Sequence, residues 1–282
     1  MFNKIDTKNI NGFEINKYEC ASHGEKPLEE LQRIIVEKIK KMKIHKDITE
    51  LMAYTPPNLN KSFANLLQKT ASEVASAKEN KIIAFHPYRS RVTEFMSQVL
   101  LEHEFGCIFS DNFDKRMNLN FHEADKHVAG VDVTGYKKIN DEFKFIICEV
   151  KASSAKSFPS KTAKDLYDDV KLNVDDNKRV LREIIDVASS INAHDEYYEE
   201  VIEFLLSITN NNDSVEALKK KVVIIPFLIR NYNDKMQSFR WDEEFNFYNP
   251  SDVNGHEITG YLWSFNYDIN DFSKETYKKA IS

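Results

Sequence analysis

The segment FKFIICEVK, residues 143–151, is apolar at most positions until it ends in charge. Because successive side chains of a strand point to opposite faces, an apolar run of this kind predicts a central strand that is covered on both sides. Glu149 and Lys151 would lie on one face near its end, and Val150 on the other. An acid and an amine at the end of a buried strand are costly to desolvate, and such charges usually persist where they pair or bind a metal.

A shorter β-branched run, HVAGVDVTGY at residues 127–136, predicts a preceding strand with a turn after it. Asp132 sits at the end of this candidate strand, and a hairpin of the two strands would bring its carboxylate close to that of Glu149. Two carboxylates and the backbone carbonyl of Val150 leave positions of an octahedral Mg²⁺ open for water and phosphate oxygens. The pattern therefore predicts a site for Mg²⁺, or alternatively Mn²⁺. Lys151 would position the attacking water of a phosphodiester hydrolysis there and stabilise its transition state.

Helical and strand-like periodicities surround these two runs. The opening residues to Cys20 indicate two strands around an Asn11-Gly12 turn, and a helix is predicted over residues 27–45. The other predicted elements are helices over residues 62–79, 89–105, 162–172, 175–191 and 197–208, strands over residues 222–230 and 258–267, and a short terminal helix. Helices before and after a mixed central sheet predict the α/β (α+β) class.

Composition argues against several classes of protein. The longest apolar runs are far shorter than the roughly 20 residues of a membrane span, and the N-terminus has no apolar signal core, so the sequence predicts a cytoplasmic protein. Three cysteines without C-x-x-C spacing indicate neither a disulfide framework nor a structural zinc site. No phosphate-cradling glycine loop occurs, so a nucleotide-driven motor would have to be another chain. The formal net charge of −6 means that binding to a polyanion needs a local basic patch.

The pairing of Asp132 with the triplet Glu149-Val150-Lys151 resembles the signature of the PD-(D/E)xK nuclease superfamily. The resemblance covers residues 82–172 approximately and departs from the pattern in having Val131 where proline is usual. It implies catalytic roles for Asp132, Glu149 and Lys151, and metal ligation by Asp132, Glu149 and the Val150 carbonyl.

The same superfamily often carries a glutamate on the helix before its sheet. Glu94, in the segment RVTEF, matches that position and is assigned a catalytic role on this resemblance. The implied fold is a restriction-endonuclease-like mixed sheet flanked by helices, with the nuclease-like domain at residues 81–282. Residues 1–80 would be a strand and helical addition, which serves either as scaffold or as a partner-docking region.

A narrower resemblance follows from the chain's size, its extended N-terminus and the GVDVTG and ICEVKAS segments. These are similar to the nuclease subunit of the Hachiman antiphage system, the HamA family. The resemblance implies a DNA-degrading effector that works with a helicase (ATPase) subunit, in agreement with the missing nucleotide loop.

Residues 151–164 contain four lysines, four serines and no acid. Next to the predicted metal site, Lys156, Lys161 and Lys164 would contact the phosphate backbone of DNA, and Arg89 and Arg91 would add to this patch. The loop could equally be a solvated one, and the arginines could pair with acids of their own helix.

Two other functions stay open from the sequence. One is a catalytically inactive nuclease fold that binds DNA or a partner protein. The other is a restriction or repair endonuclease with its own sequence or structure preference.

Overall fold

The computed structural model describes residues 2–20, 26–42, 85–109, 131–139, 142–154, 159–188, 197–210, 214–231, 241–253 and 255–281. The described strands are β1 (Phe2–Ile10), β2 (Phe13–Cys20), β3 (Val133–Ile139), β4 (Glu142–Ser153), β5 (Val222–Asn231) and β6 (Glu257–Phe265). The described α-helices are α1 (Lys26–Met42), α4 (Phe85–Phe105), α6 (Lys161–Asp175), α7 (Asn177–Ala188), α8 (Tyr198–Asn210), α9 (Ser214–Lys221) and α10 (Ile269–Ile281). Two 3₁₀ helices, η4 (Trp241–Phe245) and η5 (Pro250–Val253), precede β6.

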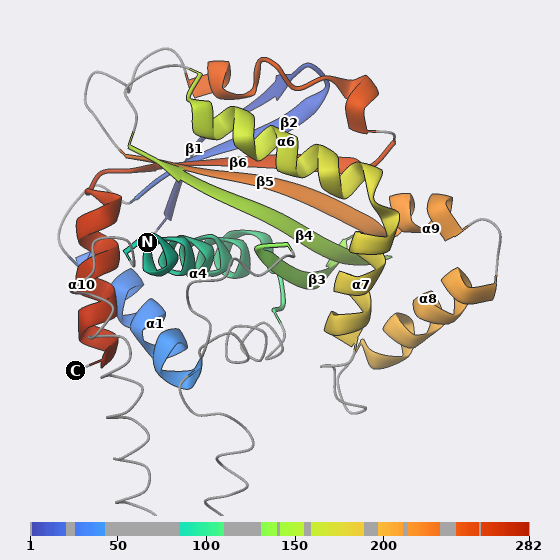
Figure 1. Cartoon of the computed structure of the whole chain (residues 1–282), viewed down its shortest axis with the longest axis horizontal. Coiled ribbons are helices and arrows are strands. Elements are labelled where there is room, and N and C mark those ends of the chain that lie inside the picture. Colours follow the sequence, from blue (N-terminus) through green and yellow to red (C-terminus); the bar gives the residue numbers. More distant parts are fainter. Residues whose placement is uncertain are drawn as a thin grey trace, which may run out of the picture.

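The described strands form one six-stranded sheet in the order β1-β2-β6-β5-β4-β3 (Figure 1). The two hairpins, β1–β2 and β3–β4, are antiparallel, whereas the four inner strands β2, β6, β5 and β4 run parallel to one another. Helices lie on both sides of the sheet (Figure 1). The predicted class, a mixed sheet flanked by helices, is therefore confirmed.

Strand β4 is buried on both faces, as its apolar run predicts. Ile146 and Cys148 belong to one core cluster, and Phe145 and Ile147 belong to the other. The strand continues beyond the predicted end to Ser153, alongside β5.

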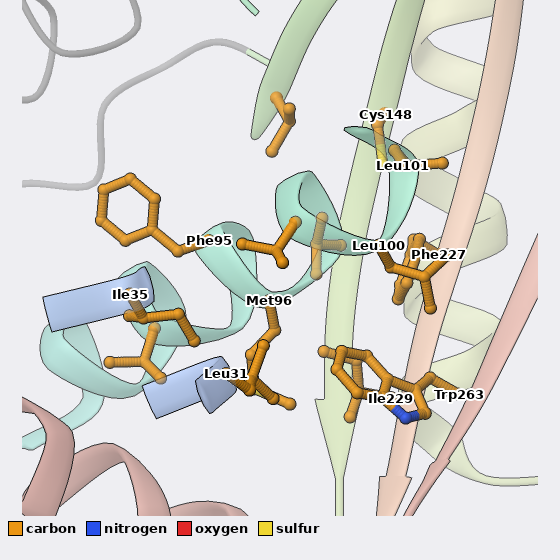
Figure 2. Packing of buried hydrophobic residues seen from close by; sticks show 14 of the residues in the cluster. Leu31, Ile35, Phe95, Met96, Leu100, Leu101, Cys148, Phe227, Ile229 and Trp263 are labelled. Carbon is orange, nitrogen blue, oxygen red and sulfur yellow. The ribbon is translucent and has the colours of Figure 1, made fainter. Parts of the chain in front are cut away.

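Helices α1, α4 and α10 cover one face of the sheet (Figure 1). Helix α4 carries the predicted apolar stripe, and its residues Phe95, Met96 and Leu100 are fully buried. Figure 2 shows Leu100 next to Phe227 of β5, and all three residues share one core cluster with Phe227 and Trp263 of β6. Burying apolar side chains at helical spacing is the main source of stability for a helix of this kind.

Helices α6, α7 and α8 cover the opposite face near β4. Helix α6 packs on β4 and β5 with the buried side chains of Ala163, Leu166, Tyr167, Val170, Asn173 and Val174. All but one of these are apolar or aromatic, so the helix lies with one continuous face on the sheet.

The N-terminus of α6 is held by a buried carboxylate. Ser160 caps the helix, since its Oγ accepts a hydrogen bond of 3.0 Å from the backbone N–H of Ala163. Glu244 of η4 accepts hydrogen bonds of 2.9 Å from both the N–H and the hydroxyl of Ser160. Arg230, near the end of β5, lies 2.8 Å from the other oxygen of Glu244. This network fixes the start of α6 against β5.

Strand β5 contains a proline in its interior. Pro226 lies opposite Glu149 of β4, and the pairing of β5 with β6 is interrupted at Ile225 and Pro226. Because proline has no N–H to donate, a gap in one ladder at this point is expected.

The predicted elements are confirmed in type wherever the structure describes them, although the bounds of β3 and β4 differ from the prediction. The Asn11-Gly12 turn has positive φ at both residues, 53° and 88°, as a tight hairpin requires. The predicted helix over residues 62–79 lies outside the described residues, as does the predicted domain boundary at residue 80. Strand β2 pairs with β6, so the first strands share one sheet with the rest of the chain. Among the described residues, no helix is both long and apolar enough to cross a membrane.

Candidate active site

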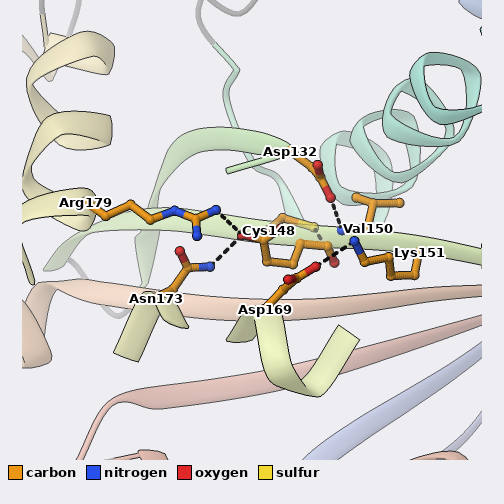
Figure 3. Close-up of polar contacts among 8 residues, drawn as sticks. Asp132, Cys148, Val150, Lys151, Asp169, Asn173 and Arg179 are labelled. Atoms are coloured by element: carbon orange, nitrogen blue, oxygen red, sulfur yellow. Dashed lines mark hydrogen bonds and ion pairs between the residues drawn. The ribbon is translucent and has the colours of Figure 1, made fainter. Parts of the chain in front are cut away.

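The β3–β4 hairpin brings Asp132 beside β4. Val133 pairs with Cys148, and Oδ2 of Asp132 accepts a hydrogen bond of 2.7 Å from the backbone N–H of Val150 (Figure 3). The hairpin was predicted, but the expectation that Asp132 ends a strand is wrong, because β3 begins only at Val133. In a regular antiparallel ladder, the Val150 N–H would donate to a backbone carbonyl of the neighbouring strand. Here it donates to the Asp132 side chain instead, and the regular pairing of β3 with β4 therefore stops at Asp132.

Glu149 of β4 is buried, with 2% of its surface exposed, and its side chain contacts helices α6 and α7. Its Oε1 accepts a hydrogen bond of 2.6 Å from the side-chain amide of Asn173. The same oxygen lies 3.2 Å from a guanidinium nitrogen of Arg179. In Figure 3 both side chains converge on this one point.

Lys151 is half-buried at the end of the same face, and its Nζ lies 2.6 Å from Oδ2 of Asp169 (Figure 3). Burial by itself would lower the pKa of Lys151, but the nearby carboxylates of Asp169, Asp132 and Glu149 raise it above its ordinary value. Lys151 is therefore an ammonium ion at neutral pH, which can donate hydrogen bonds and stabilise negative charge but cannot act as a base.

Three carboxyl groups repel one another at this end of the sheet. Burial, followed by the charge of Asp132, raises the pKa of Glu149 to about 8. Burial and the charges of Asp132 and Glu149 also raise the pKa of Glu94, on α4, to about 8. The pKa of Asp132 is raised by burial, although the Val150 N–H and the charge of Lys151 oppose the rise. Helix α4 thus brings Glu94 to the predicted acids, and the nearby positive charges of Arg91, Lys151 and Arg179 offset the burial and the repulsion only in part.

The acids suit a divalent cation in chemistry and in charge. Carboxylate oxygens are the ligands that Mg²⁺ prefers, and the charge of a cation would oppose both the burial and the repulsion that raise these pKa values. Among the described residues, no group of three or more His, Cys, Asp or Glu side chains is arranged to hold a metal ion. The smaller ligand set predicted from the sequence, Asp132 and Glu149 with the Val150 carbonyl, stays a prediction.

The predicted DNA-contacting residues are found in different surroundings. Lys161 and Lys164 are exposed on the first turn of α6. Arg89 is half-buried and donates a hydrogen bond to the backbone carbonyl of Ala152, next to Lys151. Arg91 is half-buried, and its charge lowers the pKa of Glu94. Lys156 lies outside the described residues.

Three residues that contact the site were not predicted from the sequence. Asp169, Asn173 and Arg179 belong to α6 and α7, and they reach Lys151 and Glu149 only because these helices pack on β4. One signal was present, since Asn173 interrupts the apolar face of α6 between Val170 and Val174. A buried amide on an apolar helix face usually has a hydrogen-bonding role.

Comparison with known proteins gives one extended match. A family model described as HamA matches residues 2–280. Neither a search of curated proteins nor a search of solved structures gave a match. A match over nearly the whole chain shows that this chain belongs to the HamA family, which is a component of the Hachiman antiphage defence system.

Proposed function

We propose that the chain is a Mg²⁺-dependent deoxyribonuclease of the PD-(D/E)xK type. The observation that carries this proposal is the meeting of Asp132, Glu149 and Glu94 with Lys151 at the end of the β3–β4 hairpin. Three acids whose pKa values are raised by burial, beside a charged lysine, are expensive to bury. Phosphodiester hydrolysis at a metal ion makes use of both kinds of group.

Each residue has a separate role in this proposal. Asp132, Glu149 and the Val150 carbonyl would hold Mg²⁺ or Mn²⁺, which when bound lowers the pKa of water and neutralises phosphate charge. The ammonium of Lys151 donates a hydrogen bond to the attacking water and stabilises the charge that develops on the phosphate. Glu94 adds a third carboxyl group on the side of α4, where it can accept a hydrogen bond from water.

The basic residues near the site would bind the DNA backbone. Lys161 and Lys164 are exposed where α6 begins, and Arg89 lies against Ala152, immediately after Lys151. Lys156, between these residues in the sequence, would complete the patch. Contacts of this kind hold phosphates without reading the base sequence, which suits a nuclease that degrades DNA indiscriminately.

Membership in the HamA family supports a role as the effector of a cytoplasmic defence complex. The sequence contains no nucleotide-binding loop, so a helicase subunit would supply ATP hydrolysis. Residues 1–80 are the proposed docking region for this partner.

Cleavage assays test the proposal. The purified chain, alone and together with the proteins encoded by neighbouring genes, is incubated with plasmid, linear and single-stranded DNA in Mg²⁺ or EDTA. We expect cleavage in Mg²⁺ that is lost in Glu149→Gln and Lys151→Met and retained in Lys274→Met, which changes an exposed lysine of α10. No cleavage under any condition, with DNA or partner binding unchanged in the variants, would mean that the fold is kept as a binding module.

A further inference from the structure

The junction of α6 and α7 places two hydrogen-bond donors on Glu149. Asn173 lies in the last turn of α6, and Arg179 lies in the first turn of α7. Between the helices, Asp176 caps α7, because its Oδ1 accepts hydrogen bonds from the backbone N–H groups of Lys178 at 3.1 Å and Arg179 at 3.0 Å. The backbone of Arg179 is thus fixed at the point from which its guanidinium reaches Glu149.

Burial of Asn173 is difficult to explain by packing alone. Its side chain is completely buried, and its Oδ1 has no hydrogen-bond partner within the described part of the chain. An apolar residue at this position of α6 would avoid the cost of burying an amide. The contact that offsets this cost is the 2.6 Å hydrogen bond from its Nδ2 to Glu149.

The same face of α6 also contacts Lys151. Asp169 lies one helical turn before Asn173, so the two side chains point to the same side of the helix. Asp169 pairs with Lys151, and Asn173 donates to Glu149. Side chains of one helix, α6, therefore contact both charged residues of the Glu149-Val150-Lys151 triplet.

We propose that Asn173 and Arg179 are positioning residues that orient the carboxylate of Glu149 for binding a divalent cation, an inference that rests on the proposed function. Both donate to the same oxygen, Oε1, which orients the carboxylate, and Oε2 would be the oxygen that binds the cation. Groups that fix a ligand in this way typically contribute 10- to 100-fold to metal affinity.

Direct measurement of Mn²⁺ binding by calorimetry, without DNA, tests the inference. We expect Asn173→Ala and Arg179→Met to raise the Kd for Mn²⁺ by about tenfold or more. Arg182→Met, which changes an exposed arginine of the same helix, should leave the Kd unchanged. Removing a positive charge would by itself strengthen the binding of a cation. A weaker Kd in Arg179→Met must therefore come from lost positioning.

A second set of variants separates positioning from folding. Arg179→Lys keeps a donor and should recover part of the affinity that Arg179→Met loses. In cleavage assays Asn173→Ala should raise the Mg²⁺ concentration for half-maximal rate and lower kcat, with little change in KM for DNA. Urea unfolding in EDTA identifies any variant that is simply misfolded, and Asn173→Ser then replaces Asn173→Ala.

The outcomes are distinct. Wild-type protein that binds Mn²⁺, together with folded variants that bind it equally well or more tightly, would overturn the roles of Asn173 and Arg179 but not the proposed function. Wild-type protein that binds neither Mn²⁺ nor Mg²⁺ would overturn both.

Discussion

Lys151 is useful to a nuclease only while its ammonium group points at the substrate. Asp169 holds it in place through a 2.6 Å ion pair in which each side chain is about a third exposed, 30% and 32%. We predict that Asp169→Asn lowers the cleavage rate severalfold while changing the free energy of unfolding by less than about 1 kcal/mol, since exposed pairs contribute little to stability. Asp168→Asn, at the exposed neighbouring position, should change neither. Equal rates for both variants would show that Lys151 needs no partner.

Glu94 should make the stability of the cation-free protein depend on pH. Burial, then Asp132 and Glu149, raise its pKa from 4.5 to about 8. The folded state therefore holds a proton that the unfolded state releases, and stability falls as the pH rises through this window. We predict that Glu94→Gln is more stable than the wild type at pH 8 by about 1–2 kcal/mol, with little difference at pH 4.

Urea unfolding in EDTA across pH 4 to 8 measures this effect. Glu104→Gln, at an exposed position of the same helix, provides the matched control. A Glu94→Gln curve parallel to that of the wild type would contradict the assignment. Saturating Mg²⁺ should also reduce the fall in wild-type stability, because a ligand that binds only the folded state stabilises it.

The part of the site that could be predicted from the sequence stands on residue patterns that are visible without the packing of the helices. Asp132, Glu149 and Lys151 follow from two strand-like runs joined as a hairpin, and Glu94 was assigned on the resemblance to the PD-(D/E)xK superfamily. Asp169, Asn173 and Arg179 were not predicted because their contacts depend on how α6 and α7 pack on the sheet. Local periodicity carries no information on that packing beyond the apolar face itself.

At the scale of the elements, α6 depends on how its first turn is fixed. Glu244 is completely buried and bonds both Ser160 and Arg230. We predict that Glu244→Gln destabilises the protein by about 3–5 kcal/mol, because it leaves the charge of Arg230 without its carboxylate. Ser160→Ala should cost about 1 kcal/mol through the lost helix cap. Ser154→Ala, at an exposed position before the helix, should cost nothing measurable in the same urea titrations.

Long periodic elements were predictable, and short ones were not. Strand β5 and helix α4 carry enough consecutive apolar positions to fix their type, and both were predicted within a few residues of their bounds. Helix α9 and the 3₁₀ helices η4 and η5 are too short for a period to be visible. Glu244 lies in η4, so its role at the start of α6 could not be read from the sequence.

At the scale of the whole molecule, the formal net charge of −6 opposes binding to DNA. Binding would then depend on a few local cations. We predict that the double variant Lys161→Ala, Lys164→Ala weakens DNA affinity in EDTA and reduces the salt dependence of log K by up to about 2. Lys274→Ala should leave both unchanged. If the double variant binds as the wild type does, α6 is not part of the DNA-binding surface.

The order of strands in the sheet differs from their order in the chain. Strand β6 is inserted between β2 and β5, so Glu14 pairs with Thr259. During translation both hairpins can form early, yet the two parts of the sheet stay separate until β6 is made. Helix α10, which packs on α1 and α4, is synthesised later still. A prematurely terminated chain thus lacks both the strand that joins the two parts of the sheet and the helix that packs on α4, the helix of Glu94.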